Sequence, residues 1–133
     1  MRLIKGAEPV GESDWLRFIT QHDIRSSIVM SHIRKATMGE RVCRNAQPFA
    51  RELAGRMHTF AHNGWLPEIR ERLPLRPDGF TPIGETDSEH AFCELLQRLR
   101  DVWQQPGVVP PLALRLPAIS AFAAELRRLG PAN

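Results

Sequence analysis

Residues 86–100 read TDSEHAFCELLQRLR, and this stretch predicts the most regular element of the chain. Its start fits a capping box, in which the Thr86 hydroxyl accepts a hydrogen bond from a backbone N–H and Glu89 reaches back to the cap. Behind the cap, apolar residues recur with the helical period on one stripe: Phe92, Leu95, Leu96, Leu99 and Trp103. The pattern predicts a helix whose apolar stripe packs against the rest of the protein.

Further helices are predicted on both sides of this stretch. A last helix begins near Leu116 and carries its apolar residues on one face, namely Ile119, Phe122, Leu126 and Leu129. Near the start, Ser13 or Asp14 caps a helix that runs to about Asp23, with apolar residues at Trp15, Phe18 and Ile19. The segment from Pro67 to Leu73 suits a short helix with proline in its first turn.

Short apolar runs between these helices predict strands. Ile28–His32 is typical of a buried strand, and Phe49–Leu53 and His58–His62 predict two more. We expect the strands at Ile28–His32 and His58–His62 to be neighbours, with the helices starting near Thr86 and Leu116 on one face of their sheet. The pattern alone leaves an α/β and an α+β fold open.

Length and composition narrow the class of protein. A chain of 133 residues predicts one domain at most. It has no apolar run long enough for a transmembrane helix, and its net charge of +3 includes no block of like charges, so neither a membrane nor a nucleic acid is expected as partner. Two cysteines are too few for a disulfide scaffold, which favours a reducing cytoplasm, and Cys93 is expected to be a buried apolar side chain.

Three polar clusters, residues 31–37, 60–64 and 84–89, each follow an apolar segment. Arg34 offers a planar fork that suits a carboxylate. Asn63 and Gly64 offer an amide and a backbone N–H that can stabilise an oxyanion, and Asp87 at a helix start can bind an ammonium group. Each group also has a plainer interpretation: an ion pair, a turn and a helix cap.

A metal site is not expected. Three histidines, His32, His62 and His90, invite that hypothesis, but no pair of them has the i, i+4 spacing of ligands on one helix.

The clusters occur in one order with a fourth segment, Asn45-Ala46-Gln47-Pro48-Phe49. In this order they resemble the class II glutamine amidotransferases of the N-terminal-nucleophile hydrolase superfamily, and most closely the small stand-alone bacterial type. The resemblance covers about Ser27 to Trp103. It implies an α+β fold: residues 1–133 as a single partial αββα sandwich domain, with an antiparallel sheet and helices on one face.

The resemblance also implies roles for individual residues. Arg34, with Thr37 nearby, would bind the α-carboxylate of glutamine, and Asp87 would bind its α-amino group. Asn63 and Gly64 would form the oxyanion hole. The implied substrate is glutamine or a γ-glutamyl compound, with no cofactor. The implied partners are an ammonia-accepting protein or a second copy of the chain.

The family's nucleophile is an N-terminal cysteine whose own amine is the base, whereas this sequence begins Met1-Arg2-Leu3. Cys43, the first cysteine, has no base beside it in the sequence. We therefore expect a chain that is truncated at both ends and inactive as it stands. A mis-set start and a natural truncation both stay open, as does the alternative of a non-catalytic binding or assembly module. Missing strands would leave an unpaired sheet edge and favour self-association.

Overall fold

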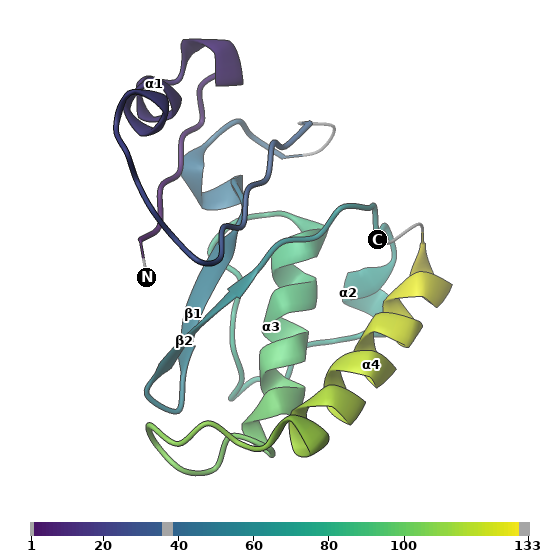
Figure 1. The fold of residues 1–133 in the computed structure, drawn as a ribbon. Coiled ribbons are helices and arrows are strands. Elements are labelled where there is room, and N and C mark those ends of the chain that lie inside the picture. Colours follow the sequence, from purple (N-terminus) through teal and green to yellow (C-terminus); the bar gives the residue numbers. More distant parts are fainter. Residues whose placement is uncertain (1, 36–38, 131–133) are drawn as a thin grey trace.

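The computed structural model describes residues 2–35 and 39–130. Its elements follow one another along the chain as η1 (Val10–Glu12), α1 (Asp14–Gln21), η2 (Cys43–Asn45), β1 (Phe49–Leu53), β2 (Arg56–Phe60), α2 (Ile69–Arg72), α3 (Asp87–Arg100) and α4 (Leu112–Leu129). Figure 1 shows a β-hairpin on one side of α3 and α4 on the other. The fold is α+β, and its sheet is antiparallel as expected.

The two strands form a tight hairpin whose register runs from Phe49 opposite Phe60 to Leu53 opposite Arg56. Ala54 and Gly55 connect the strands with φ angles of 52° and 73°. Positive φ at both central residues is the requirement of a two-residue hairpin turn that matches the twist of the strands. The strand predicted at Phe49–Leu53 is confirmed, and the next one begins two residues earlier than expected.

Helix α3 is the centre of the packing. The Thr86 hydroxyl accepts from the Glu89 N–H at 3.1 Å, which confirms the predicted cap. The predicted stripe is also confirmed: Phe92, Leu96 and Leu99 are buried, together with residues of β1 and the chain beyond α3. The Phe92 ring stacks on Phe60 of β2 at a centroid distance of 5.3 Å. The capping box is only half formed, because the Glu89 carboxylate binds other groups.

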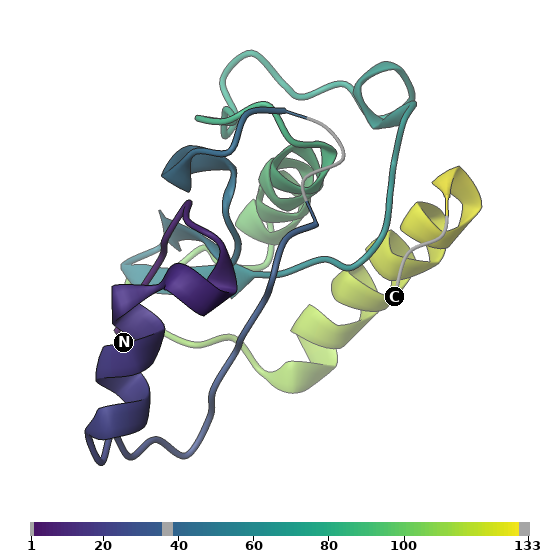
Figure 2. The same ribbon diagram turned by 90° about the horizontal axis from the view of Figure 1, so that it is seen from above.

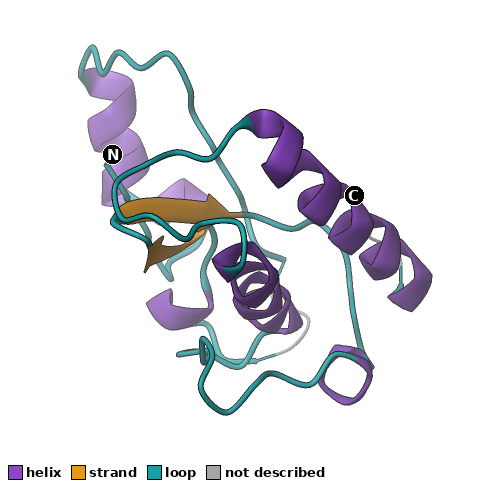
Figure 3. Cartoon of the chain, turned by 90° about the horizontal axis from the view of Figure 1, so that it is seen from below, coloured by secondary structure: helices purple, strands orange, loops and turns teal. Residues whose placement is uncertain are grey.

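The last helix packs on the other side of α3, and Figure 3 shows this arrangement along the axis of α3. Helix α4 begins at Leu112, four residues before the expected start. Its Phe122 and Leu126 are buried against α2 and α3, as predicted, and Leu129 is partly buried, whereas Ile119 of the same predicted face is 39% exposed. An ion pair between Arg98 and Glu125, 2.6 Å long, joins the two long helices. Helix α2 is shorter than the predicted segment.

The strand predicted at Ile28–His32 is wrong. These residues form no strand in the structure, and Ile28 and Val29 are 85% and 78% exposed. A strand needs a neighbour for its backbone N–H and C=O groups, and within the described residues only β1 and β2 pair. The apolar run therefore lies on the surface.

Helix α1 forms where the sequence predicts it and ends at Gln21, two residues early. The Ser13 hydroxyl caps it by accepting from the Leu16 N–H at 3.3 Å. Its apolar stripe is exposed, since Trp15 and Phe18 keep 51% and 43% of their accessible surface. Figure 2 shows α1 set apart from α3 and α4.

Among the described helices, none combines the length and the apolar character that crossing a bilayer requires.

Candidate active site

Four separate segments of the chain line one cavity of about 490 Å³. They contribute residues 32–35, Gln47, residues 62–70 in part, and residues 85–88. Arg34, Asn63, Gly64 and Asp87 are all among the lining residues. The structure therefore brings together four of the five side chains or backbone groups singled out in the sequence. The fifth, Thr37, lies outside the described residues.

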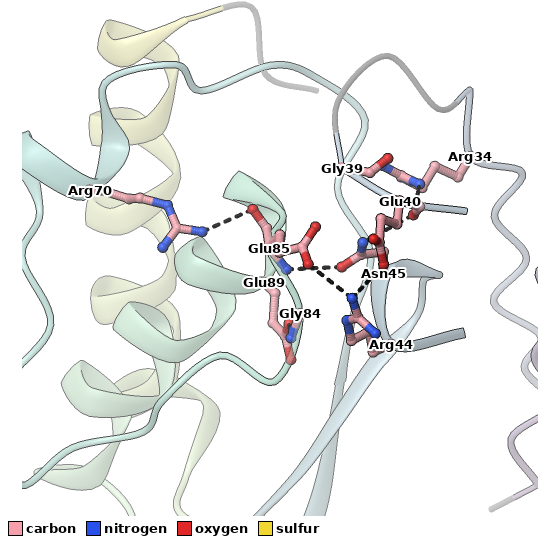
Figure 4. A network of polar contacts seen from close by, with 9 residues as sticks. All are labelled: Arg34, Gly39, Glu40, Arg44, Asn45, Arg70, Gly84, Glu85 and Glu89. Carbon is pink, nitrogen blue, oxygen red and sulfur yellow. Dashed lines mark hydrogen bonds and ion pairs between the residues drawn. The ribbon is translucent and has the colours of Figure 1, made fainter. Parts of the chain in front are cut away.

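Arg34 is half-buried and binds the backbone of Gly39 and Glu40. Its Nη1 donates to the Glu40 carbonyl oxygen at 3.1 Å, and its Nη2 donates to the Gly39 carbonyl oxygen at 3.5 Å, as Figure 4 shows. A guanidinium group carries five N–H donors. These bonds to backbone carbonyls orient the guanidinium group at the edge of the cavity.

Asp87 is the first residue of α3, and its carboxylate is held on both oxygens. Oδ2 accepts from the Leu66 N–H at 2.6 Å, and Oδ1 accepts from the Ser88 N–H at 2.7 Å. The positive end of the helix dipole favours a negative charge at this place. The Ser88 hydroxyl also donates to Oδ1 at 3.3 Å, so it is Oδ2 that can accept a second bond, from an ammonium N–H.

Asn63 and Gly64 are exposed and lie just beyond β2, after the buried His62. The His62 N–H donates to Gln47 Oε1 at 2.6 Å, and Gln47 Nε2 donates to the His62 carbonyl oxygen at 3.1 Å. The ring Nδ1 lies 3.0 Å from the Ser88 hydroxyl, which connects this turn to the start of α3. The side chains of Gln47 and Ser88 therefore fix the residue that precedes the two candidate donors.

Burial lowers the pKa of His62, while the nearby Asp87 carboxylate acts in the opposite direction and His32 adds to the lowering. A buried imidazole loses hydration when it is charged, so the neutral ring is favoured. The site thus holds a neutral histidine beside a carboxylate at neutral pH.

Two buried polar side chains hold the loop in front of α3. Glu89 Oε2 accepts from the Gly84 N–H at 2.6 Å and Oε1 accepts from the Ile83 N–H at 3.1 Å, and the same carboxylate pairs with Arg51 of β1. Asn45 accepts from the Glu85 N–H at 2.9 Å and donates to the Glu40 carbonyl at 3.0 Å (Figure 4). These contacts set the position of the start of α3 relative to Glu40, whose carbonyl oxygen Arg34 also binds.

The positioning roles of Asn45, Gln47 and Glu89 were not predicted from the sequence. Asn45 and Gln47 belong to an ordered motif, and Glu89 belongs to the predicted cap. The sequence therefore indicates each of these residues but not the residue that it contacts. Glu89 pairs with Arg51, which lies 38 positions earlier in the chain. No local pattern reports a partner at that separation.

The two cysteines lie in different surroundings. Cys43 is exposed in η2, and Cys93 is buried in α3, as predicted. Burial raises the pKa of the Cys93 thiol to about 11, so this residue stays a neutral thiol near neutral pH. Among residues 2–35 and 39–130, no group of three or more histidine, cysteine, aspartate or glutamate side chains is arranged to hold a metal ion.

Comparison with known proteins decides the family. The family model described as "Glutamine amidotransferases class-II" matches residues 1–133. The chain belongs to the class II glutamine amidotransferases. This amidotransferase chain is 39% identical over 132 residues to the protein named "Putative glutamine amidotransferase YafJ" from Escherichia coli K12, a match that covers 99% of the chain and 50% of that protein.

Two further similarities agree with this assignment. A Haemophilus influenzae protein named "Putative glutamine amidotransferase" is 46% identical over 88 residues. The match covers 65% of the amidotransferase chain and 29% of that protein. A 2.0 Å crystal structure of a predicted glutamine amidotransferase from Pseudomonas aeruginosa matches with a TM-score of 0.57 at 42% identity, over 68% of this chain and 33% of that one. The amidotransferase chain spans about half the length of these relatives or less.

Proposed function

We propose that residues 1–133 form part of one glutamine amidotransferase domain and hold the groups that recognise glutamine. The observation that carries this proposal is the single cavity of about 490 Å³ that Arg34, Asn63, Gly64 and Asp87 line together. In this proposal Arg34, with Thr37 nearby, binds the α-carboxylate, and Asp87 binds the α-ammonium. Asn63 and Gly64 donate to the side-chain amide oxygen.

The charges of the cavity support recognition of an amino-acid head group. A guanidinium fork pairs with a carboxylate through two parallel hydrogen bonds, and a carboxylate pairs with an ammonium group through charge-assisted bonds. Arg34 and Asp87 supply one partner of each kind, and neighbouring backbone groups orient both. A zwitterion therefore has a counter-charge for each of its ends.

Asn63 and Gly64 suit the reaction of the family. Attack of a thiolate on the amide carbon turns the carbonyl oxygen into an oxyanion before ammonia leaves and the thioester is hydrolysed. Removing one donor from such an oxyanion costs roughly 3 kcal/mol of transition-state stabilisation. These donors lower the barrier for an attacking atom but do not supply one.

We expect a polypeptide of these 133 residues to bind glutamine without releasing ammonia from it. Its thiols are Cys43 and Cys93, and neither is an N-terminal residue with a free amine as base. Cys93 is buried as a neutral thiol. The family's mechanism uses an N-terminal cysteine with its own amine as base, so neither of these two thiols suits that role.

Binding is tested by calorimetry with glutamine on the wild type and on two variants, Arg34→Gln and Asp87→Asn. Each variant removes one charge that faces the head group, so we expect at least a roughly tenfold loss of affinity. The matched controls are Arg115→Gln and Asp101→Asn, which alter charged residues outside the cavity lining. Undetectable binding by the wild type, or equal losses in the controls, would contradict the proposal.

Turnover is tested by measuring ammonia release from glutamine beside a Cys43→Ser variant. We expect both proteins to stay at background. Release that is present in the wild type and disappears in Cys43→Ser would make Cys43 a substitute nucleophile and would overturn the expectation of inactivity.

One observation favours the alternative of an assembly module. Trp15, Ile28 and Val29 expose 51%, 85% and 78% of their surfaces, and a concentration of exposed apolar side chains in one part of the chain is typical of interaction surfaces. Glutamine binding separates the two candidate functions, because an assembly module has no need to discriminate glutamine from other amino acids.

A further inference from the structure

Beyond the last paired residues of β1 and β2, one side chain continues the hydrogen bonding between the two chain segments. In the register of β1 and β2, Phe49 lies opposite Phe60, so two further steps place position 47 opposite position 62. Pro48 lies between, and proline has no backbone N–H to donate. At position 47 the side chain takes over: Gln47 accepts from the His62 N–H at 2.6 Å and donates to the His62 carbonyl at 3.1 Å.

A primary amide can replace a backbone neighbour because it carries the same two functions, one N–H donor and one carbonyl acceptor. Gln47 therefore satisfies both backbone groups of His62, as a residue on a paired strand would. His62 is 5% exposed, so water cannot easily do the same.

The contact to the His62 carbonyl also fixes the following residue. The His62 C=O and the Asn63 N–H belong to one planar peptide group and point in opposite directions. Holding the carbonyl on Gln47 Nε2 thus sets the direction in which the chain enters Asn63 and Gly64. Gln47 itself lines the same cavity as these two residues.

We propose that Gln47 is a positioning residue, whose side-chain amide orients the Asn63–Gly64 turn toward the amide group of bound glutamine. This inference rests on the proposed function, since it takes Asn63 and Gly64 as donors to that amide. Gln47 would act through His62, whose backbone N–H and C=O groups it binds.

The test compares glutamine with norvaline, which has the same head group but no side-chain amide. In Gln47→Ala we expect glutamine affinity to fall roughly tenfold, because the turn no longer presents its donors, while norvaline affinity stays unchanged. Gln47→Glu keeps the size and the acceptor but loses the donor to the His62 carbonyl. We expect it to lose glutamine affinity as Gln47→Ala does.

The matched control is Gln97→Ala. Gln97 is 2% exposed and also holds a backbone group with its amide, by accepting from the Arg76 N–H at 3.0 Å, but it lies outside the cavity lining. We expect it to destabilise the protein without changing the preference for glutamine over norvaline. Equal losses for both ligands in Gln47→Ala, or the same change of preference in Gln97→Ala, would overturn the proposal.

Backbone amide hydrogen exchange separates a failure of this inference from a failure of the proposed function. If the wild type binds neither amino acid, the proposed function is wrong, and the role of Gln47 is decided by exchange at the His62 N–H, which donates to Gln47 Oε1. We expect faster exchange at this amide in Gln47→Ala, with the amides of α3 unchanged. Unchanged exchange at His62 would overturn the assignment to Gln47.

Discussion

The Glu89 carboxylate is 1% exposed and accepts three hydrogen bonds, from two backbone N–H groups of the preceding loop and from Arg51 of β1. A buried charge is tolerated only when it is paired and hydrogen-bonded. Here the pairing joins the hairpin, α3 and the loop at Ile83–Gly84. One side chain therefore couples three parts of the chain that surround the candidate site.

Replacing Glu89 with glutamine should destabilise the protein by roughly 3 kcal/mol, because Arg51 would keep a largely buried charge without its partner. Urea unfolding measures the change. The control is Glu68→Gln, which breaks an ion pair with Arg72 whose side chains are 62% and 57% exposed, and we expect less than about 0.5 kcal/mol there. Similar losses in both variants would show that Glu89 contributes no more than a surface charge.

His62 should make stability depend on pH. Burial lowers the pKa of its imidazole in the folded chain, whereas the unfolded chain takes up a proton at about pH 6.5. The unfolded state therefore binds more protons between that pH and the lower pKa of the folded state, so the stabilisation is complete above about pH 6.5 and is lost as the pH falls through the folded-state pKa.

The measurement is the free energy of unfolding at about pH 8 and about pH 5.5. We expect the wild type to lose more stability on acidification than His62→Gln does. His22→Gln, which changes an exposed histidine, should keep the wild-type pH dependence. An identical dependence in wild type and His62→Gln would contradict the assignment to His62.

At the scale of elements, the start of α3 organises the site. Thr86 caps the helix, Asp87 faces the cavity, Ser88 contacts His62, and Glu89 holds the preceding loop. These four consecutive residues thus make four different contacts around the site. The first turn of a helix permits this because successive side chains lie about 100° apart around the helix axis. The loop at Gly84 must approach this turn closely.

Gly84→Ala should therefore destabilise the protein. An added Cβ would lie 2.9 Å from Glu89 Oε2 and 3.0 Å from the Arg44 carbonyl oxygen, and closer still to the buried Asn45 amide. Overpacking of this kind costs about 1–3 kcal/mol. Gly11→Ala is the control, since nothing lies within 4 Å of its added Cβ, and thermal unfolding compares the two. Equal melting temperatures would show that the loop relaxes freely.

The sequence predicted elements well where local signals suffice. Helix α3 carries its own cap and stripe, and the hairpin strands lie next to each other in the chain. The strand at Ile28–His32 failed because a strand depends on a partner that local sequence does not specify. In the site, the ordered motifs indicated Arg34, Asn63 and Asp87, but the contacts of Gln47 and Glu89 join segments 15 and 38 positions apart.

At the scale of the whole molecule, apolar surface is distributed unevenly. The core lies between the hairpin, α3, α2 and α4, where the large apolar side chains are buried. The N-terminal part contrasts with it: α1 has no buried residue, and Ile28, Val29 and Ile33 are 85%, 78% and 71% exposed. Single exposed apolar residues are common on proteins, but a concentration of them in one segment is typical of a contact surface.

We predict that the isolated chain self-associates through this segment. Burying exposed apolar surface between two copies is favourable, and mass action makes the association depend on protein concentration. Sedimentation velocity should show the average mass rising with concentration for the wild type. An Ile28→Lys and Val29→Lys double variant should stay closer to the monomer, because the charged side chains resist burial.

The matched control is Ile83→Lys, which adds a charge at a side chain that is 70% exposed but lies in the loop before α3. If association proceeds through the N-terminal segment, this variant should associate like the wild type. Equal weakening in both variants would point to a general effect of charge and not to a defined surface. A wild type that remains monomeric at all concentrations would mean that the exposed apolar segment does not bind a second copy.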